Sequence, residues 1–81
     1  MKEVKVKGYW YKEAGTIYVA RPYYDMFVIY MGAGHDIEGR WFGWSHIKIG
    51  DKLPYGGTLT SAMIREAVEK AEGVKEFALR F

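Results

Sequence analysis

The fold is decided by residues 58–81, which read TLTSAMIREAVEKAEGVKEFALRF. The first part predicts an amphipathic helix, because its apolar side chains fall on one side of a helical wheel: Met63, Ile64, Ala67, Val68 and Ala71. Thr58 or Thr60 can cap the start of this helix, and Gly73 is the residue type that ends a helix with a left-handed turn. Beyond that turn the sequence alternates as a half-buried strand does, with apolar side chains at Phe77, Leu79 and Phe81.

The rest of the chain reads as strands and turns. Four segments have the alternation or the apolar run expected of strands, at residues 4–12, 16–21, 26–31 and 40–49. The third is apolar almost throughout, so we expect a central strand buried on both faces. The predicted fold class is therefore α+β, a mainly antiparallel twisted sheet of about five strands (β-β-β-β-α-β) with one helix from the C-terminal half packed on one face.

Composition sets limits on the class of protein. The 81 residues fit one domain spanning residues 1–81, and the absence of cysteine leaves apolar burial as the source of its stability. No apolar run approaches the roughly 18 residues that span a membrane, so we expect a soluble, cytoplasmic protein without a membrane partner. The net charge of +2 is small, and residues 1–24 carry all of the positive surplus, whereas the rest of the chain sums to a slight negative charge. This is a local patch rather than the global field of a strongly basic nucleic-acid protein.

Alternation divides the strand side chains between two faces. We expect the helix to cover the face that holds the apolar set Val4, Val6, Trp10, Ile17, Val19, Ile47 and Ile49. One helix covers only one face of a sheet. The other face should therefore display cationic and aromatic side chains together, namely Lys5, Lys7, Tyr9, Tyr11, Tyr18, Arg40, Phe42, Trp44, His46 and Lys48.

Unpaired nucleic acid is bound by such a mixture, because bases stack on aromatic rings while Lys and Arg meet the phosphates. A stacked base contributes about 1–3 kcal/mol, whereas an exposed ion pair contributes roughly 0–1 kcal/mol, so the rings should dominate. The leading hypothesis is a small non-enzymatic protein that binds single-stranded nucleic acid or a nucleotide-like ligand with modest affinity.

Residues 40–47 resemble part of a known nucleic-acid-binding element, the RNP1 strand of RNA-recognition motifs. The pattern of that strand is basic, Gly, aromatic, Gly or Ala, aromatic, Val, any residue, aromatic. The matching positions are Arg40, Phe42, Gly43 and Trp44. The chain departs from the pattern at Trp41, Ser45 and Ile47, and no helix is expected between its first two strands. The resemblance is limited to these eight residues.

The same aromatic face has two other interpretations. Small β-rich domains can curl until both faces become core, and an apolar face can also pair with a second copy. A protein-interaction module, acting as an inhibitor or adaptor and possibly homodimeric, is therefore the alternative function.

The start of the predicted helix is a candidate anion site. No acidic residue occupies its first turn, which leaves backbone N–H groups and hydroxyls available to an anion at the positive end of the helix dipole. The candidate residues are Gly57, Thr58, Thr60, Ser61 and Arg65. Ordinary helix capping explains the same residues, and the spacing of a phosphate-binding loop is missing.

Catalytic and metal-binding patterns are weak. His35, Asp36 and Glu38 lie together in a glycine-rich stretch, but three ligands in fixed geometry are needed for a catalytic zinc and this stretch offers no rigid spacing. No nucleophile with an evident base can be assembled. We expect no enzymatic activity, no metal and no cofactor.

Overall fold

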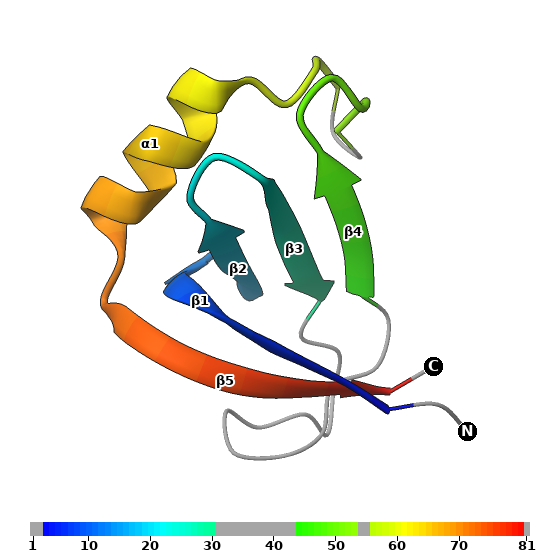
Figure 1. Cartoon of the computed structure of the whole chain (residues 1–81), viewed down its shortest axis with the longest axis vertical. Coiled ribbons are helices and arrows are strands. Elements are labelled where there is room, and N and C mark those ends of the chain that lie inside the picture. The colour runs from blue at the N-terminus through cyan, green and yellow to red at the C-terminus, as the bar shows by residue number, and fades with distance from the viewer. Residues whose placement is uncertain (1–2, 31–43, 54–55, 81) are drawn as a thin grey trace.

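The computed structural model describes residues 3–30, 44–53 and 56–80 (Figure 1). Its elements are β1 (Glu3–Glu13), β2 (Thr16–Arg21), β3 (Asp25–Tyr30), β4 (Trp44–Lys48), α1 (Ser61–Lys70) and β5 (Gly73–Arg80). The strands form one antiparallel sheet in the order β4-β3-β2-β1-β5. The predicted α+β class and the order of its elements are confirmed.

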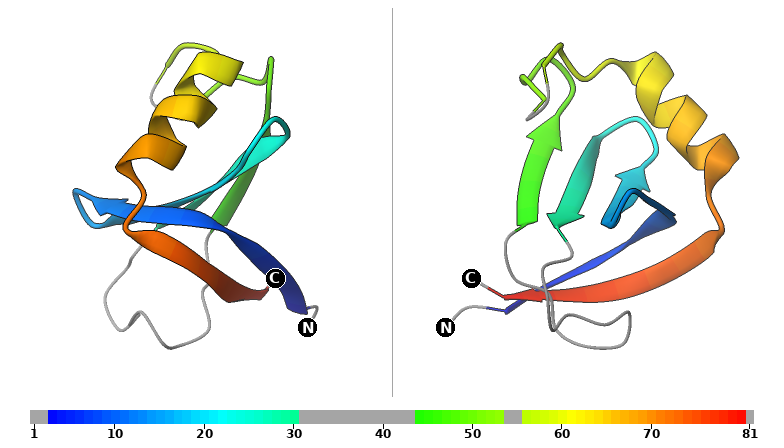
Figure 2. Two further views of the ribbon diagram at one scale, coloured as in Figure 1. Left: turned by 60° about the vertical axis from the view of Figure 1, so that its left-hand side comes forward. Right: turned by 180° about the vertical axis from the view of Figure 1, so that it is seen from behind.

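The strand β1 belongs to both halves of the sheet. Residues 9–13 pair with β2, and residues 3–10 pair with β5. Figures 1 and 2 show that the sheet is strongly curled, with β4 and β5 as its two edge strands. Gly8 directly precedes the residues of β1 that pair with β2, and a Cβ atom there would come within 2.7 Å of the carbonyl oxygen of Ala20. The close approach of β1 and β2 therefore requires a glycine at this position.

Apolar side chains are buried on both faces of the curled sheet. The inner core lies on the concave face and consists of Val6, Ile17, Val19, Phe27, Ile29, Phe77 and Leu79. The helix-side core lies on the face that α1 covers and consists of Ala20, Met26, Val28, Ile47, Leu53, Leu59, Ile64 and Ala67. The strand β3 contributes to both cores, which confirms that it is a central strand buried on both faces.

The prediction of which face the helix covers is wrong for β1 and β2. The side chains expected beneath the helix lie in or against the inner core instead, at Val4, Val6, Trp10, Ile17 and Val19. Tyr11 and Tyr18, expected on the uncovered face, pack against the helix-side core. The cause is the curl, because a sheet that folds over itself encloses its concave face without a helix.

The prediction is confirmed for the turn after β1 but only in part for the buried side chains of β4. A two-residue turn closes the β1–β2 hairpin, with φ of 51° at Ala14 and 75° at Gly15, as in a type I′ turn. The predicted short loop at this place is confirmed.

At β4, Ile47 is buried in the helix-side core as expected, but Ile49 lies beyond the end of the strand and is exposed. The inward assignment of Ile49 is therefore wrong.

The helix α1 starts as the sequence predicts. The hydroxyl oxygen of Thr60 accepts a hydrogen bond from the backbone N–H of Met63 at 3.3 Å, as an N-cap side chain does. Ile64 and Ala67 are buried against the sheet, and Val68 is half-buried.

The end of the helix differs from the prediction. The helix stops at Lys70, and Gly73 is the first residue of β5 rather than a left-handed helix end. The backbone N–H of Glu72 donates to the carbonyl oxygen of Trp10 at 2.8 Å, so the chain joins the sheet directly after the helix. The strand β5 consequently begins before the alternating residues that predicted it.

Candidate binding surfaces

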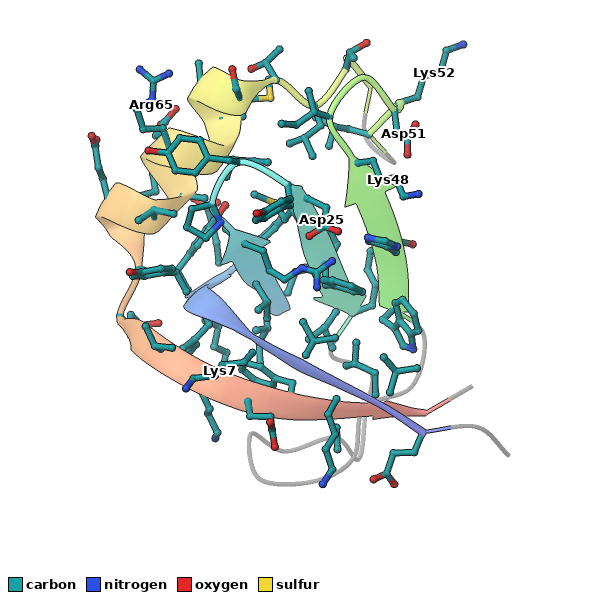
Figure 3. All side chains as sticks on the ribbon, in the orientation of Figure 1. Lys7, Asp25, Lys48, Asp51, Lys52 and Arg65 are labelled. Atoms are coloured by element: carbon teal, nitrogen blue, oxygen red, sulfur yellow. The ribbon has the colours of Figure 1, made fainter. Side chains whose placement is uncertain are left out.

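Five of the ten predicted site residues lie on one face of β1 and β2. Lys5, Lys7, Tyr9 and Tyr11 alternate along β1, and we call these four residues the β1 row. Side chains two positions apart on a strand repeat at roughly 6.6 Å. The two lysines and Tyr9 are exposed, whereas Tyr11 is half-buried. The row is bordered on β5 by the paired residues Ala78, Glu76 and Val74. Its accessible part is therefore two ammonium groups followed by one phenol ring (Lys7 in Figure 3).

The fifth residue, Tyr18, is stacked on Tyr11. Their ring centroids are 4.8 Å apart at an angle of 11°, and the ammonium group of Lys70 lies 5.7 Å from the centroid of the Tyr11 ring. Both rings pack against the helix-side core. A hollow of about 180 Å³ beside Tyr11 is also lined by Glu13, Glu66 and Lys70. Its two carboxylates outnumber its one ammonium group, which disfavours a phosphate there. These two rings are therefore occupied within the fold.

The predicted residues of β4 lie on the opposite face. The Trp44 ring packs on Phe27 with centroids 5.5 Å apart, and the His46 ring stacks on the same phenyl ring at 4.3 Å and 3°. Lys48 is exposed beyond them. Arg40 and Phe42, with most of the stretch that resembles RNP1, lie outside the described residues. The predicted set is thus divided between two faces of the sheet.

A buried ionic cluster, which the sequence analysis missed, joins one end of β2, β3 and β4. The Asp25 side chain is only 6% exposed, and its carboxylate accepts hydrogen bonds from Arg21 Nε at 2.5 Å and from Arg21 Nη2. His46 Nε2 lies 2.7 Å from Asp25 Oδ2, and the Arg21 guanidinium lies 5.2 Å from the centroid of the Phe27 ring. Both carboxylate oxygens are engaged, so the cluster has a structural role.

The neighbours of Asp25 determine its protonation. Burial by itself raises the pKa of this carboxyl, but the hydrogen bonds and charges of Arg21 and His46 outweigh burial and hold the pKa below its ordinary value. The hydrogen bond to Asp25 in turn raises the pKa of Arg21. A sequence signal did exist, since Arg21 and Asp25 flank a three-residue turn and pair directly in the sheet.

We expect Asp25→Asn to lower the free energy of unfolding by about 1–2 kcal/mol at neutral pH, because a charge-assisted hydrogen-bond network is lost while the half-exposed Arg21 remains screened by water. Because the folded-state pKa of Asp25 is lowered, its contribution is complete above the unfolded-state value near 3.8 and is lost as the pH falls through the folded-state value. Urea unfolding of both proteins should therefore show a stability difference that shrinks below about pH 4.

A suitable control for this experiment is Glu76→Gln, which removes an exposed carboxylate on β5. It should change the free energy of unfolding by less than about 0.5 kcal/mol. A difference between Asp25→Asn and the parent that stays constant into strong acid would contradict the assignment.

The turn between β2 and β3 carries the most exposed large hydrophobic side chains of the described residues, Tyr23 at 83% and Tyr24 at 73%. The backbone N–H of Tyr24 donates to the carbonyl oxygen of Arg21 at 3.1 Å, which places Pro22 and Tyr23 at the centre of the turn. Tyr23 has φ of 69°, the conformation that the second central residue of a type II turn needs and that glycine or asparagine prefers. A tyrosine there costs about 1 kcal/mol or more. Folding stability therefore does not explain this exposed ring.

The five residues predicted to bind an anion have separate roles. The Thr60 hydroxyl caps the helix, while Gly57 and Thr58 belong to the connection between β4 and α1. Ser61 and Arg65 do share a surface, a groove that also involves the β2–β3 turn. Anion binding by the whole set stays a prediction.

Within residues 3–30, 44–53 and 56–80, no three His, Asp or Glu side chains are close enough to hold a metal ion. The predicted acidic and histidine stretch, His35, Asp36 and Glu38, lies outside the described residues. In the part of the chain that the structure describes, no helix has the length and apolar character needed to cross a membrane.

Comparison with known proteins gives no family assignment. No protein-family model matches the chain, and no curated protein or solved structure matches it.

Proposed function

We propose that this chain is a small binding protein without catalytic activity, and that its β1 row holds single-stranded nucleic acid or a nucleotide-like ligand. The observation that supports this is the line of Lys5, Lys7 and Tyr9, all exposed on one face of one strand. Ammonium groups can meet successive phosphates while a base stacks on the neighbouring ring, which is how single strands are bound without sequence preference.

The expected affinity is low, because Tyr9 is the one residue of the β1 row whose ring is exposed. One stacked base contributes about 1–3 kcal/mol, and two exposed ammonium–phosphate contacts add roughly 0–1 kcal/mol each. A dissociation constant of 1 mM corresponds to about 4 kcal/mol. Binding by this row alone should therefore be millimolar, or high micromolar at low salt.

The test is a nuclear magnetic resonance titration of the labelled protein with an oligothymidylate of about eight nucleotides at low salt. We expect the largest amide shifts in residues 5–9 and in their paired partners on β5. Tyr9→Ala should raise the dissociation constant about tenfold, which corresponds to the loss of one stacked base. With two phosphates neutralised, the slope of log K against log salt should be about −1.4.

Matched lysine variants give the control for this titration. The double variant Lys5→Ala/Lys7→Ala should bring the salt slope close to zero. Lys48→Ala and Lys52→Ala remove the same charge at the far side of the molecule (Figure 3) and should leave binding unchanged. Shifts that avoid β1, or equal weakening by the control variants, would reject nucleic-acid binding by this row.

A second candidate, a protein-interaction module, is favoured by a different observation. Tyr23 and Tyr24 are highly exposed, and the backbone of Tyr23 is held in a conformation that tyrosine disfavours. Tyrosine and arginine are enriched at protein interfaces, and Arg65 lines the groove beside Tyr23. This candidate uses a surface distinct from the β1 row, so the two can be tested separately.

A further inference from the structure

A groove lies between the β2–β3 turn and α1. It is lined by Pro22, Tyr23, Ser61, Ile64, Arg65 and Val68, and has a volume of about 80 Å³. Ile64 is buried and Val68 half-buried, so the floor of the groove is aliphatic. A cavity of about 150 Å³ holds benzene. The groove, which we call the Tyr23 groove, therefore has room for one smaller apolar side chain, such as that of valine.

The wall of the Tyr23 groove is built at a cost to the fold. Glycine or asparagine would satisfy the backbone of the turn better than Tyr23, whose φ is 69°. Packing of the ring within the chain offsets little of this unfavourable free energy, since the residue is 83% exposed. Unfavourable backbone conformations persist at functional positions, where a side chain must be presented in a particular direction.

The rim of the groove carries an available positive charge. Arg65 is exposed and forms no salt bridge with any residue in the described ranges 3–30, 44–53 and 56–80. Figure 3 shows its guanidinium on the outward side of α1. The first turn of the helix also contains no acidic side chain. A carboxylate placed at this rim would meet a guanidinium that can bind it through two hydrogen bonds.

We propose that the Tyr23 groove docks an extended segment of another protein in which a small apolar side chain lies next to an aspartate or glutamate. The apolar side chain fills the space above Ile64 and Val68, and the carboxylate pairs with Arg65. Tyr23 forms one wall and Tyr24 lies beside it, which supplies the rigid aromatic surface that interfaces use. This inference rests on the protein-interaction candidate and specifies which residues its partner should carry.

The test begins with a library of random peptides displayed on phage and selected on the immobilised protein. Enriched peptides should share an apolar residue next to Asp or Glu. One of them is then synthesised and titrated against variants. Tyr23→Gly should weaken its binding at least tenfold and raise the Tm by about 4–8 °C, because glycine relieves the turn. The raised Tm would show that the variant is folded, so that lost binding could not be attributed to unfolding.

A double-mutant cycle tests the ion pair. Arg65→Gln should weaken binding of the selected peptide about fivefold, as expected for a well-formed ion pair at an exposed rim. Replacing the peptide carboxylate by an amide should raise the dissociation constant for the parent protein by a similar factor. The same replacement should not change the dissociation constant for Arg65→Gln, because the ion pair is already absent. Lys48→Ala, which removes an exposed lysine on β4, should leave peptide affinity unchanged.

The outcomes separate the inference from the function on which it rests. If no peptide is enriched, the groove is rejected as a site for an extended segment, whereas interaction with a folded partner or a second copy elsewhere on the chain is not. If peptides are enriched but bind Tyr23→Gly and Arg65→Gln as well as the parent, the groove is rejected while protein interaction elsewhere on the chain remains. Selection of basic or carboxylate-free peptides also overturns the proposed partner chemistry. The oligonucleotide titration is independent of all these results.

Discussion

Replacing Phe77 with alanine should lower the free energy of unfolding by about 3–5 kcal/mol, as expected for a buried aromatic side chain. Phe77 is 1% exposed in the inner core, is paired with Val6, and meets the Trp10 ring edge-on with centroids 6.3 Å apart. A domain of this length has a total stability of about 4–12 kcal/mol. Urea unfolding followed by circular dichroism should therefore show a large shift or a protein that is already unfolded.

The matched control is Val74→Ala on the same strand. Val74 lies on the other face of β5 and is 52% exposed, so its truncation should change stability by less than about 0.5 kcal/mol. If Phe77→Ala cost no more than Val74→Ala, the faces of β5 would be assigned the wrong way round and the inner core would not exist as described.

Gly8→Ala should lower the free energy of unfolding by about 2–3 kcal/mol. The added Cβ atom would lie 2.7 Å from the carbonyl oxygen of Ala20 and 2.9 Å from Cγ1 of Val19. A backbone oxygen cannot turn away as a flexible side chain can, so β1 and β2 must separate at this point. Thermal unfolding measures the loss as a lower Tm.

Gly73→Ala provides the same chemical change in the same sheet without the clash. Its added Cβ atom would lie 3.6 Å from Trp10 Nε1, an ordinary contact distance. This variant should be close to neutral. Equal stability of the two alanine variants would mean that β1 and β2 do not approach each other as closely as the structure shows.

Sequence alone was sufficient for the kind and order of the elements, but not for the side of the sheet on which each residue lies. Alternation correctly groups Val6 with Trp10 and Ile17 with Val19, because it is a local property of each strand. Which group the helix covers depends on how far the sheet curls, which is set by contacts between distant segments. The need for glycine at position 8 likewise depends on a contact between strands, because it arises from the backbone of Ala20 on β2.

The candidate surfaces were predictable to different degrees. Lys5, Lys7 and Tyr9 share an exposed face, as their spacing indicates, because a strand fixes the direction of every second side chain. The Tyr23 groove could not be predicted, since it joins a turn to a helix far along the chain. Pro22 does suggest a turn, but a tyrosine in the left-handed position that follows runs against turn preferences.

The pairing of β1 with β5 has a consequence for the order of folding. It joins Glu3 to Arg80, while the β1–β2 and β2–β3 hairpins join neighbouring segments. Closing so long a loop lowers the entropy of the chain before the contacts between the two strands have formed. Such non-local pairings therefore slow folding. The hairpins can therefore form early, whereas the inner core remains open to water until the last strand arrives and completes it.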